Sequence, residues 1–536
     1  MESRSNSVAS AAASGGVLDA PAGPVTDSGQ IRPAPIGARL AAISRAVYCD
    51  DRSLQLALLA CMLLVYGPLL WVSASLSPGG PLELTFNSML EHLLHGQFDV
   101  DPKIVGLEGF LRNGHVYAYW GIWCALLRLP LWVYRRMDLD VTTWSCLAAV
   151  CLAGMAKVRA LLLLRRHATQ KTAAADWAFG LMLAYVLLGG SQIGYLRISI
   201  YQEVIFWAYA FAAVFVYLAV KGLVNRWFNL GTLSRMALFA GLALLTRVPT
   251  GVGLLLAMAL LLLVLAVQSV TAQAGASDPV IWRLGRELAR HRILIPLGIL
   301  AVLVVIAAVV NYFRWDNPAT FANYALYIDN QRFPDWLPRM QMYGSFNLHR
   351  LWFGLGYYFL PLWVVSGRHG QLLFLQTHQS LFDRVEVPPS SFFLTDLLPI
   401  CFILFLAIAL WRRRARGLSP VDQWTAALAL GLLVPCLLML IYISVTYRYR
   451  MDFYPEIDLL AFLGLYVTLT DEAMMATFAR HRRWMTAALM VSVASSFMAL
   501  SLYDLALTPP GKLHAYYHQG VQLFYRINAR FFGLHS

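Results

Sequence analysis

The chain has 536 residues, of which 59% are hydrophobic and 13% are charged, and its formal net charge at pH 7 is +13. A mean hydropathy of +0.59 excludes a series of ordinary soluble domains and indicates a membrane protein. The positive charge does not indicate a nucleic-acid-binding protein, because the arginines lie in short clusters between apolar runs instead of along one polar face.

The first 38 residues are rich in Ala, Ser, Gly and Pro and lack the short apolar core of a signal peptide. We expect a disordered cytoplasmic tail there, followed by a first span that serves as an uncleaved signal anchor. The seven cysteines are scattered singly, without the spacing of a zinc site. The sequence therefore predicts no metal site, no disulfide framework and no cofactor.

Long apolar runs predict membrane-spanning helices, because a hydrocarbon core about 30 Å thick needs roughly 20 apolar residues per helix. Five runs contain no charged residue, at 53–75, 251–270, 293–312, 424–446 and 484–503. Six less uniform segments complete the set, at 141–163, 174–194, 200–220, 235–249, 393–411 and 455–470. We expect an all-α integral membrane protein with about 11 transmembrane helices.

Clusters of Arg and Lys recur on every second connection between the spans, which places those connections in the cytoplasm. The amino terminus is then cytoplasmic, and the tail at 506–536 is external. Residues 39–505 form the transmembrane domain, with two long external loops at 76–140 and 313–392. The apolar stretch 351–366 either lies at the outer interface or makes a twelfth crossing.

In the first external loop, apolar residues recur at helical spacing from Glu83 to His95, which predicts an amphipathic helix on the membrane surface. The simplest role for Glu83 is a charge at the start of that helix. The dipeptide Asp101-Pro102 favours a turn. Asn113 and Gly114 predict another turn, ahead of an aromatic run that suits either interfacial anchoring or sugar stacking.

Several segments resemble the GT-C superfamily, the polytopic glycosyltransferases that use polyprenyl-phosphate-linked sugars. They are ELTFNSMLEHLLHGQFDV (83–100), NGHVYAYWGIWCALLRLP (113–130), LALLTRVPTG (242–251), NYFRWDNPATFANY (311–324) and YRYRMDFYPEIDLLA (447–461). The likeness is greatest to bacterial members related to protein mannosyltransferases and to lipopolysaccharide-core galacturonosyltransferases. It covers residues 53–505 and rests on the order of the segments together with the predicted topology.

The resemblance implies a carboxylate base in the first external loop, and the position that matches it is Glu83. The family more often has Asp, frequently followed by Glu, where this chain has Leu82-Glu83. Asp99, Asp101 and Glu108 are the alternative bases.

Displacing a polyprenyl phosphate also requires positive charge near the leaving phosphate, and the forked guanidinium of arginine suits that task. Arg247 is the first candidate, because a charge at the end of a span is costly unless it faces a cavity or headgroups. Arg448 and Arg450 are further candidates, with pairing to Asp452 at the interface as the simpler role.

Other polar residues have weaker claims. His115 and Tyr117 of the first loop, and Arg314 and Asp316 of the second, are candidate substrate-binding residues or parts of solvated loops. We expect Arg197 and Glu203 to pair across a short external turn. Lys157 is expected to extend toward the cytoplasmic interface.

With the resemblance, we expect a bacterial inner-membrane glycosyltransferase that moves a hexosyl or pentosyl group from a polyprenyl-phosphate-linked donor to an envelope acceptor (lipid, glycan or protein) at the external face. Its partners are that donor, the acceptor and membrane lipids, with no nucleic acid. One alternative is a transporter or lipid flippase, which needs ionisable residues near the bilayer midplane. A second is a non-catalytic membrane partner in envelope assembly.

Overall fold

The computed structural model describes residues 51–76, 80–272, 291–360, 381–386, 390–414 and 419–505. The chain divides into two units, Met1–Leu56 and Ala57–Ser536, and every contact described below lies within the second. The predicted tails at 1–38 and 506–536, and residues 361–366, lie outside the described residues.

Each of the eleven predicted spans overlaps a helix, although α11 ends five residues before the predicted span 235–249 does. Eight helical segments are long and apolar enough to cross a membrane: α2 (Asp51–Leu76), α7 (Thr142–Arg166), α8 with α9 (Ala173–Leu188 and Gly190–Ile193), α10 (Ile200–Val224), α12 (Val248–Ala272), α14 (His291–Trp315), α20 (Pro420–Ile441) and α22 (Glu472–Leu505). Three shorter helices match the remaining spans: α11 (Leu230–Leu244), α19 (Leu397–Arg413) and α21 (Tyr454–Thr470). The prediction of an all-α membrane protein is confirmed.

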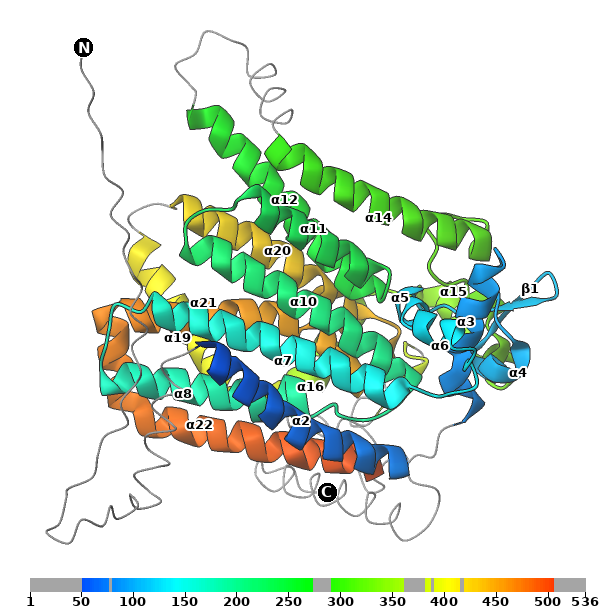
Figure 1. Cartoon of the computed structure of the whole chain (residues 1–536), viewed down its shortest axis with the longest axis horizontal. Helices are drawn as coiled ribbons and strands as arrows, with labels where there is room; N and C mark the ends of the chain where they lie inside the picture. Colours follow the sequence, from blue (N-terminus) through cyan, green and yellow to red (C-terminus); the bar gives the residue numbers. More distant parts are fainter. Residues whose placement is uncertain are drawn as a thin grey trace, which may run out of the picture. The chain divides into compact units, whose positions relative to one another are not determined.

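The helices pack closely where small residues face a neighbouring backbone. A Cβ added at Gly431 of α20 would lie 2.2 Å from the Ala257 Cα of α12, and one at Gly464 of α21 would lie 2.0 Å from the Phe402 carbonyl of α19. Small residues at these points allow the backbones to approach, as in other membrane bundles. Figure 1 shows α7, α10, α11, α12 and α20 side by side.

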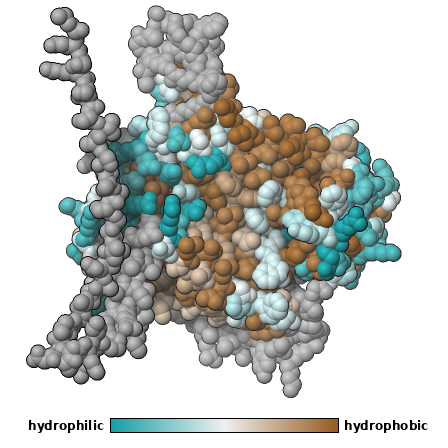
Figure 2. All heavy atoms as spheres, in the orientation of Figure 1, coloured by the Kyte–Doolittle hydropathy of each residue, from teal (hydrophilic) through white to brown (hydrophobic). Residues whose placement is uncertain are grey.

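The outer surface of the helices is apolar. Large side chains such as Leu64 (75% exposed), Val302 (60%) and Leu430 (60%) point away from the protein. In Figure 2, hydrophobic residues cover much of the visible face over the helices, and hydrophilic residues gather toward the end that holds the β1–β2 hairpin. This surface is what lipid contact requires.

The first predicted external loop folds into short elements at one end of the helices (Figure 1). They are η1 (Pro81–Leu84), α3 (Thr85–Leu94), α4 (Pro102–Val105), η2 (Gly106–Glu108), β1 (Phe110–Arg112), β2 (His115–Tyr117), α5 (Trp123–Leu126) and α6 (Leu129–Val133). The predicted turn at Asn113 and Gly114 joins β1 to β2, and both residues have positive φ (51° and 82°), as a two-residue hairpin requires. The apolar face of α3, with Phe86, Met89 and Leu90, packs into a buried core against other protein side chains.

The second predicted external loop is also a series of short elements. They are η3 (Tyr324–Leu326), η4 (Ile328–Gln331), α15 (Trp336–Tyr343), η5 (Leu348–Arg350), α16 (Leu351–Phe359), β3 (Arg384–Val385) and α18 (Phe392–Thr395). The nine residues of α16 are too few to span a bilayer. Strand β3 pairs in parallel with β4 (Ser444–Val445), which leads directly into the 3-10 helix η7 (Tyr447–Asp452).

Candidate active site

The two loops meet in the fold although about 200 residues separate them. Phe110 forms an antiparallel bridge with Tyr327, and the Ile328 amide donates to the Gly109 carbonyl at 3.0 Å. A Cβ at Gly109 would lie 2.4 Å from Cγ1 of Val116 in the same loop, so glycine allows the first loop to pack closely beside this contact. The contact brings the Tyr327 hydroxyl to 3.0 Å from Glu108 Oε2 and fixes that carboxylate where the loops join.

Two cavities adjoin this contact. The larger has a volume of about 350 Å³, and the smaller, of about 90 Å³, contains Glu108 in its wall. Six residues line both: Tyr119, Tyr201, Tyr324, Tyr442, Arg448 and Tyr449. The larger cavity also has the apolar character that is common in ligand pockets, with Val204, Ile205, Phe321, Phe346 and Met439 in its wall.

Arg448 lies at the boundary between the cavities. Its guanidinium lies over the rings of Tyr201 (4.7 Å to the centroid) and Tyr449 (5.4 Å). Among the described residues, no carboxylate lies within 4.0 Å of it, although several other arginines of this region have such a partner. Stacking on aromatic faces orients the guanidinium but leaves its charge for an anionic ligand.

Arg247 also lines the larger cavity, but its charge is already balanced. It lies in the turn between α11 and α12, since α11 ends at Leu244, and it donates to both oxygens of Asp452 at 2.6–3.2 Å. Thr250 donates to the same carboxylate at 2.6 Å. This pairing matches the simpler role that the sequence left open for Asp452, with Arg247 as the partner instead of Arg448 or Arg450.

Arg450 lies away from both cavities. It is fully buried, and Nη2 donates to Asp396 Oδ2 at 3.1 Å and to Thr395 Oγ1 at 2.6 Å. The rings of Phe392 and Tyr447 lie 4.1 Å and 5.2 Å from its guanidinium carbon. Of the three predicted phosphate-binding arginines, the structure thus brings Arg247 and Arg448 to the cavities.

Glu83 and Asp101 act at helix starts. Glu83 Oε2 accepts from the Gly80 amide at 2.9 Å, the helix-end role considered above, and Glu83 lines neither cavity. Burial raises the pKa of the Glu83 carboxyl, although the bond from Gly80 opposes the shift. Asp101 caps α4 by accepting from the Lys103 amide at 2.8 Å, consistent with the predicted turn.

Asp99 lies between two histidines. Its Oδ1 is 2.7 Å from Nδ1 of His92, and its Oδ2 is 2.7 Å from Nδ1 of His115. Partial burial works to raise the pKa of Asp99, but the hydrogen bonds from the two histidines outweigh it and hold that pKa below the ordinary value. Neither Asp99 nor His115 lines the two cavities.

The other predicted substrate-binding residues join the loops to each other. Arg314 is 2% exposed, and Nη1 donates to the Trp120 carbonyl at 2.7 Å. Asp316 pairs with Arg112, whose guanidinium carbon lies 6.0 Å from the Tyr117 ring. Tyr117, Arg314 and Asp316 do not line the cavities, so their contacts support the loop structure.

Two predictions about buried charges were wrong. Glu203 pairs with Arg128 at 2.6 Å and 2.8 Å, both fully buried, whereas Arg197 lies over the Tyr503 ring. Lys157 is 1% exposed and donates to Ser191 at 2.7 Å, so it does not extend to the interface. In both cases a buried partner from another segment of the chain offsets the cost of burying the charge, and the sequence alone does not reveal that partner.

Sequence reasoning missed Asp383, which lines the smaller cavity with Glu108. Burial raises the pKa of Asp383 to about 6, against the opposing charges of Arg339 and Arg350. No motif surrounds it, and only the pairing of β3 with β4 brings it close. Among the described residues, no group of three or more His, Cys, Asp or Glu side chains is arranged to hold a metal ion.

No family model and no curated protein matches the sequence. Among solved structures, the chain is similar to the archaeal oligosaccharyltransferase AglB from Archaeoglobus fulgidus in complex with an inhibitory peptide and a dolichol-phosphate (TM-score 0.43, 13% identity, 88% of this chain and 60% of that chain). It is also similar to ArnT from Cupriavidus metallidurans bound to undecaprenyl phosphate (TM-score 0.37, 15% identity, 88% of this chain and 76% of that chain). The chain thus spans about 60% of the length of the archaeal protein.

Proposed function

We propose that the chain is a membrane glycosyltransferase that moves a sugar from a polyprenyl-phosphate-linked donor to a lipid, glycan or protein acceptor at the external face. The observation that supports this most is the position of Glu108 and Arg448 in the wall of one cavity, with Arg448 also in the wall of the larger one. A carboxylate and a cation without an ion-pair partner among the described residues are the two groups that such a transfer requires.

In this proposal Arg448 binds the donor phosphate. It lacks a carboxylate partner among the described residues, while Arg247 on the same cavity wall is paired with Asp452. Negative charge grows on the bridging oxygen as the bond to the sugar breaks, so a fixed guanidinium stabilises the departing phosphate more than the bound donor. Val204, Ile205, Phe346 and Met439 on the larger cavity would contact the first isoprenyl units.

Glu108 is the proposed general base. The acceptor hydroxyl oxygen attacks the anomeric carbon, the bond from that carbon to the phosphate oxygen breaks, and the phosphate leaves with the electron pair. The Glu108 carboxylate takes the hydroxyl proton. Glu83, which the family resemblance assigns to this task, is the second candidate and is distinguished from Glu108 by mutation.

The wall of the smaller cavity suits a sugar. Tyr119, Tyr324 and Trp336 offer ring faces and polar edges, and aromatic side chains with a polar tip bind amphipathic rings well. Asn330 and Asp383 add hydrogen-bonding groups on the same wall.

The test is a transfer assay with purified protein in detergent, with a panel of polyprenyl-phosphate sugars as donors. Undecaprenyl phosphate and dolichol-phosphate carriers are the first to try, since these lipids are bound in the two similar structures. A nucleotide-linked sugar serves as the control donor. Release of free polyprenyl phosphate together with a glycosylated acceptor supports the proposal.

The detergent assay also separates the rival functions. A transporter or flippase has no compartments to connect in detergent and produces no new glycosidic bond. A non-catalytic partner likewise leaves the donor intact. Turnover of the nucleotide sugar alone would overturn the assignment of a polyprenyl-linked donor. Turnover of no donor, while lipid moves across reconstituted vesicles, would overturn the glycosyltransferase assignment.

A further inference from the structure

The 3-10 helix η7 joins the cavity to buried ion pairs on two sides. Arg448 and Tyr449 line both cavities. Arg450 is paired with Asp396, and Asp452 is paired with Arg247. Within its six residues, η7 thus places Arg448, the proposed phosphate-binding residue, on the cavity wall. The buried ion pairs of Arg450 and Asp452 hold the backbone of the same segment in place.

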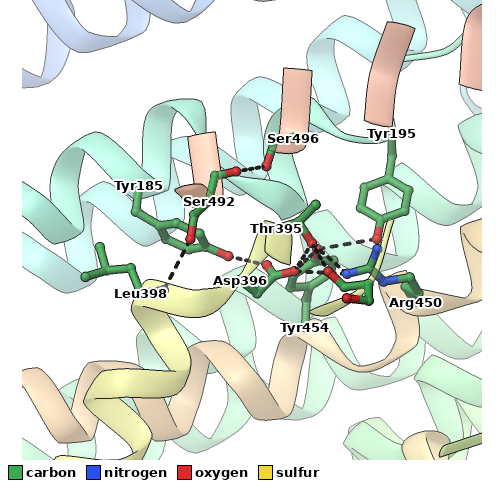
Figure 3. Close-up of polar contacts among 10 residues, drawn as sticks. Tyr185, Tyr195, Thr395, Asp396, Leu398, Arg450, Tyr454, Ser492 and Ser496 are labelled. Carbon is green, nitrogen blue, oxygen red and sulfur yellow. Dashed lines mark hydrogen bonds and ion pairs between the residues drawn. The ribbon is translucent and has the colours of Figure 1, made fainter. Parts of the chain in front are cut away.

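Asp396 is the centre of the larger of these networks. It is fully buried and accepts from Arg450 Nη2 at 3.1 Å, from the Tyr185 hydroxyl at 2.5 Å and from the Tyr454 hydroxyl at 3.2 Å. Thr395 donates to it at 2.5 Å. Figure 3 shows these donors converging on one carboxylate from separate segments of the chain.

The surroundings leave Asp396 little freedom to move. A Cβ added at Gly190 would lie 2.5 Å from Asp396 Oδ1 and 2.7 Å from the Tyr454 hydroxyl. Arg450 is held in turn between the Phe392 and Tyr447 rings. Buried pairs of this kind contribute little net stability but can specify a single geometry, because a displaced charge would lose every partner.

We infer that Asp396 is a positioning residue for the proposed reaction: by holding Arg450, it fixes η7 and so aims Arg448 at the donor phosphate. Asp396 itself lines neither cavity. Its effect on the phosphate passes through Arg450, with which it pairs, and then through Arg448. The inference rests on the proposed function, since it needs Arg448 to bind that phosphate.

A second buried carboxylate provides a matched control. Asp458 of α21 is 3% exposed and accepts from the Tyr209 hydroxyl at 2.5 Å, and the Lys157 charge acts on it. It therefore resembles Asp396 in burial, tyrosine partner and nearby cation. No hydrogen bond or ion pair described for Asp458 leads to η7, and its charge acts on Asp396 only through space. Losing that charge should therefore affect folding more than the aim of Arg448.

The experiment is a double-mutant cycle on the full chain, with the dissociation constant for undecaprenyl phosphate and kcat/KM for a donor as the two readouts. The four proteins are wild type, Asp396→Asn, Arg448→Gln and the double variant; Asp458→Asn is the control. We expect Asp396→Asn to weaken binding and kcat/KM about tenfold in wild type but less than about twofold when Arg448 is already Gln, since interacting residues are not additive. Asp458→Asn should leave both readouts within about twofold.

Equal effects of Asp396→Asn in both Arg448 backgrounds would overturn the inference and leave the proposed function standing. So would an equal loss in Asp458→Asn. If Asp396→Asn does not fold, Arg450→Lys replaces it in the same cycle, because Lys keeps the charge but loses the guanidinium fork, and the same non-additivity is expected. A wild-type protein that neither binds lipid phosphate nor turns over a donor would overturn the proposed function and this inference with it.

Discussion

Replacing Arg448 with Gln removes the one guanidinium on the shared cavity wall that has no carboxylate partner among the described residues. A hydrogen bond to a charged group contributes about 1.5–3 kcal/mol, so the loss should weaken lipid phosphate binding roughly 10- to 150-fold. Protein stability should change less than in a variant that breaks an ion pair, since the guanidinium loses its contacts with the Tyr201 and Tyr449 rings and the longer-range attraction of Glu386.

Arg247→Gln is the matched comparison, because Arg247 lines the same cavity. Its removal leaves Asp452, 1% exposed, without its charged partner, so the melting temperature should fall together with affinity. The assay titrates undecaprenyl phosphate against each purified variant and records thermal unfolding in the same detergent. Unchanged affinity in Arg448→Gln, with a folded protein, would refute the assignment of the phosphate site.

Three further predictions follow from the geometry. Because the pKa of Asp383 is raised to about 6 from an ordinary 3.8, the folded state binds the proton more tightly than the unfolded state does. The melting temperature should therefore decline as pH rises from 4 through 6. Asp383→Asn should flatten that decline, and a pH profile parallel to that of wild type would contradict the prediction. Glu203→Gln leaves the Arg128 charge buried without its ion-pair partner, so the free energy of unfolding should fall by about 3–5 kcal/mol. Replacing both Glu203 and Arg128 with Met should recover most of that loss in the same unfolding measurement. Gly121→Ala would place a Cβ 2.1 Å from the Leu245 carbonyl beside the larger cavity, so it should impair both folding and donor binding. Gly180→Ala is the control: its Cβ meets no atom within 4 Å, and it should be neutral in both assays.

The helices could be predicted because lipid imposes a length and an apolar composition on each one. The end of α11 could not be predicted in the same way, because the residues on both sides of the Thr246-Arg247 turn are apolar. The family resemblance favoured Glu83, but the choice between Glu83 and Glu108 depends on the bridge between Phe110 and Tyr327. Such long-range pairs leave no local periodicity in the sequence.

The buried charges illustrate the same limit. The arginines at 247, 448 and 450 attract attention because charge near a membrane is costly, but the sequence does not say which of them is paired. The partners lie far away in the sequence: Asp452 is 205 residues from Arg247, and Asp396 is 54 residues from Arg450. Only the fold separates Arg448, which faces the cavities, from the two arginines that are paired.

The most direct test of the central claim compares Glu108→Gln with Glu83→Gln in the transfer assay, each checked for folding in detergent. Gln keeps the shape of the side chain and removes the base. We predict that Glu108→Gln lowers kcat by roughly a hundredfold or more, while Glu83→Gln, which loses a charged cap on the Gly80 amide, stays within about threefold of wild type. An unimpaired Glu108→Gln beside an inactive but folded Glu83→Gln would contradict the account and move the reaction to the start of the first predicted external loop.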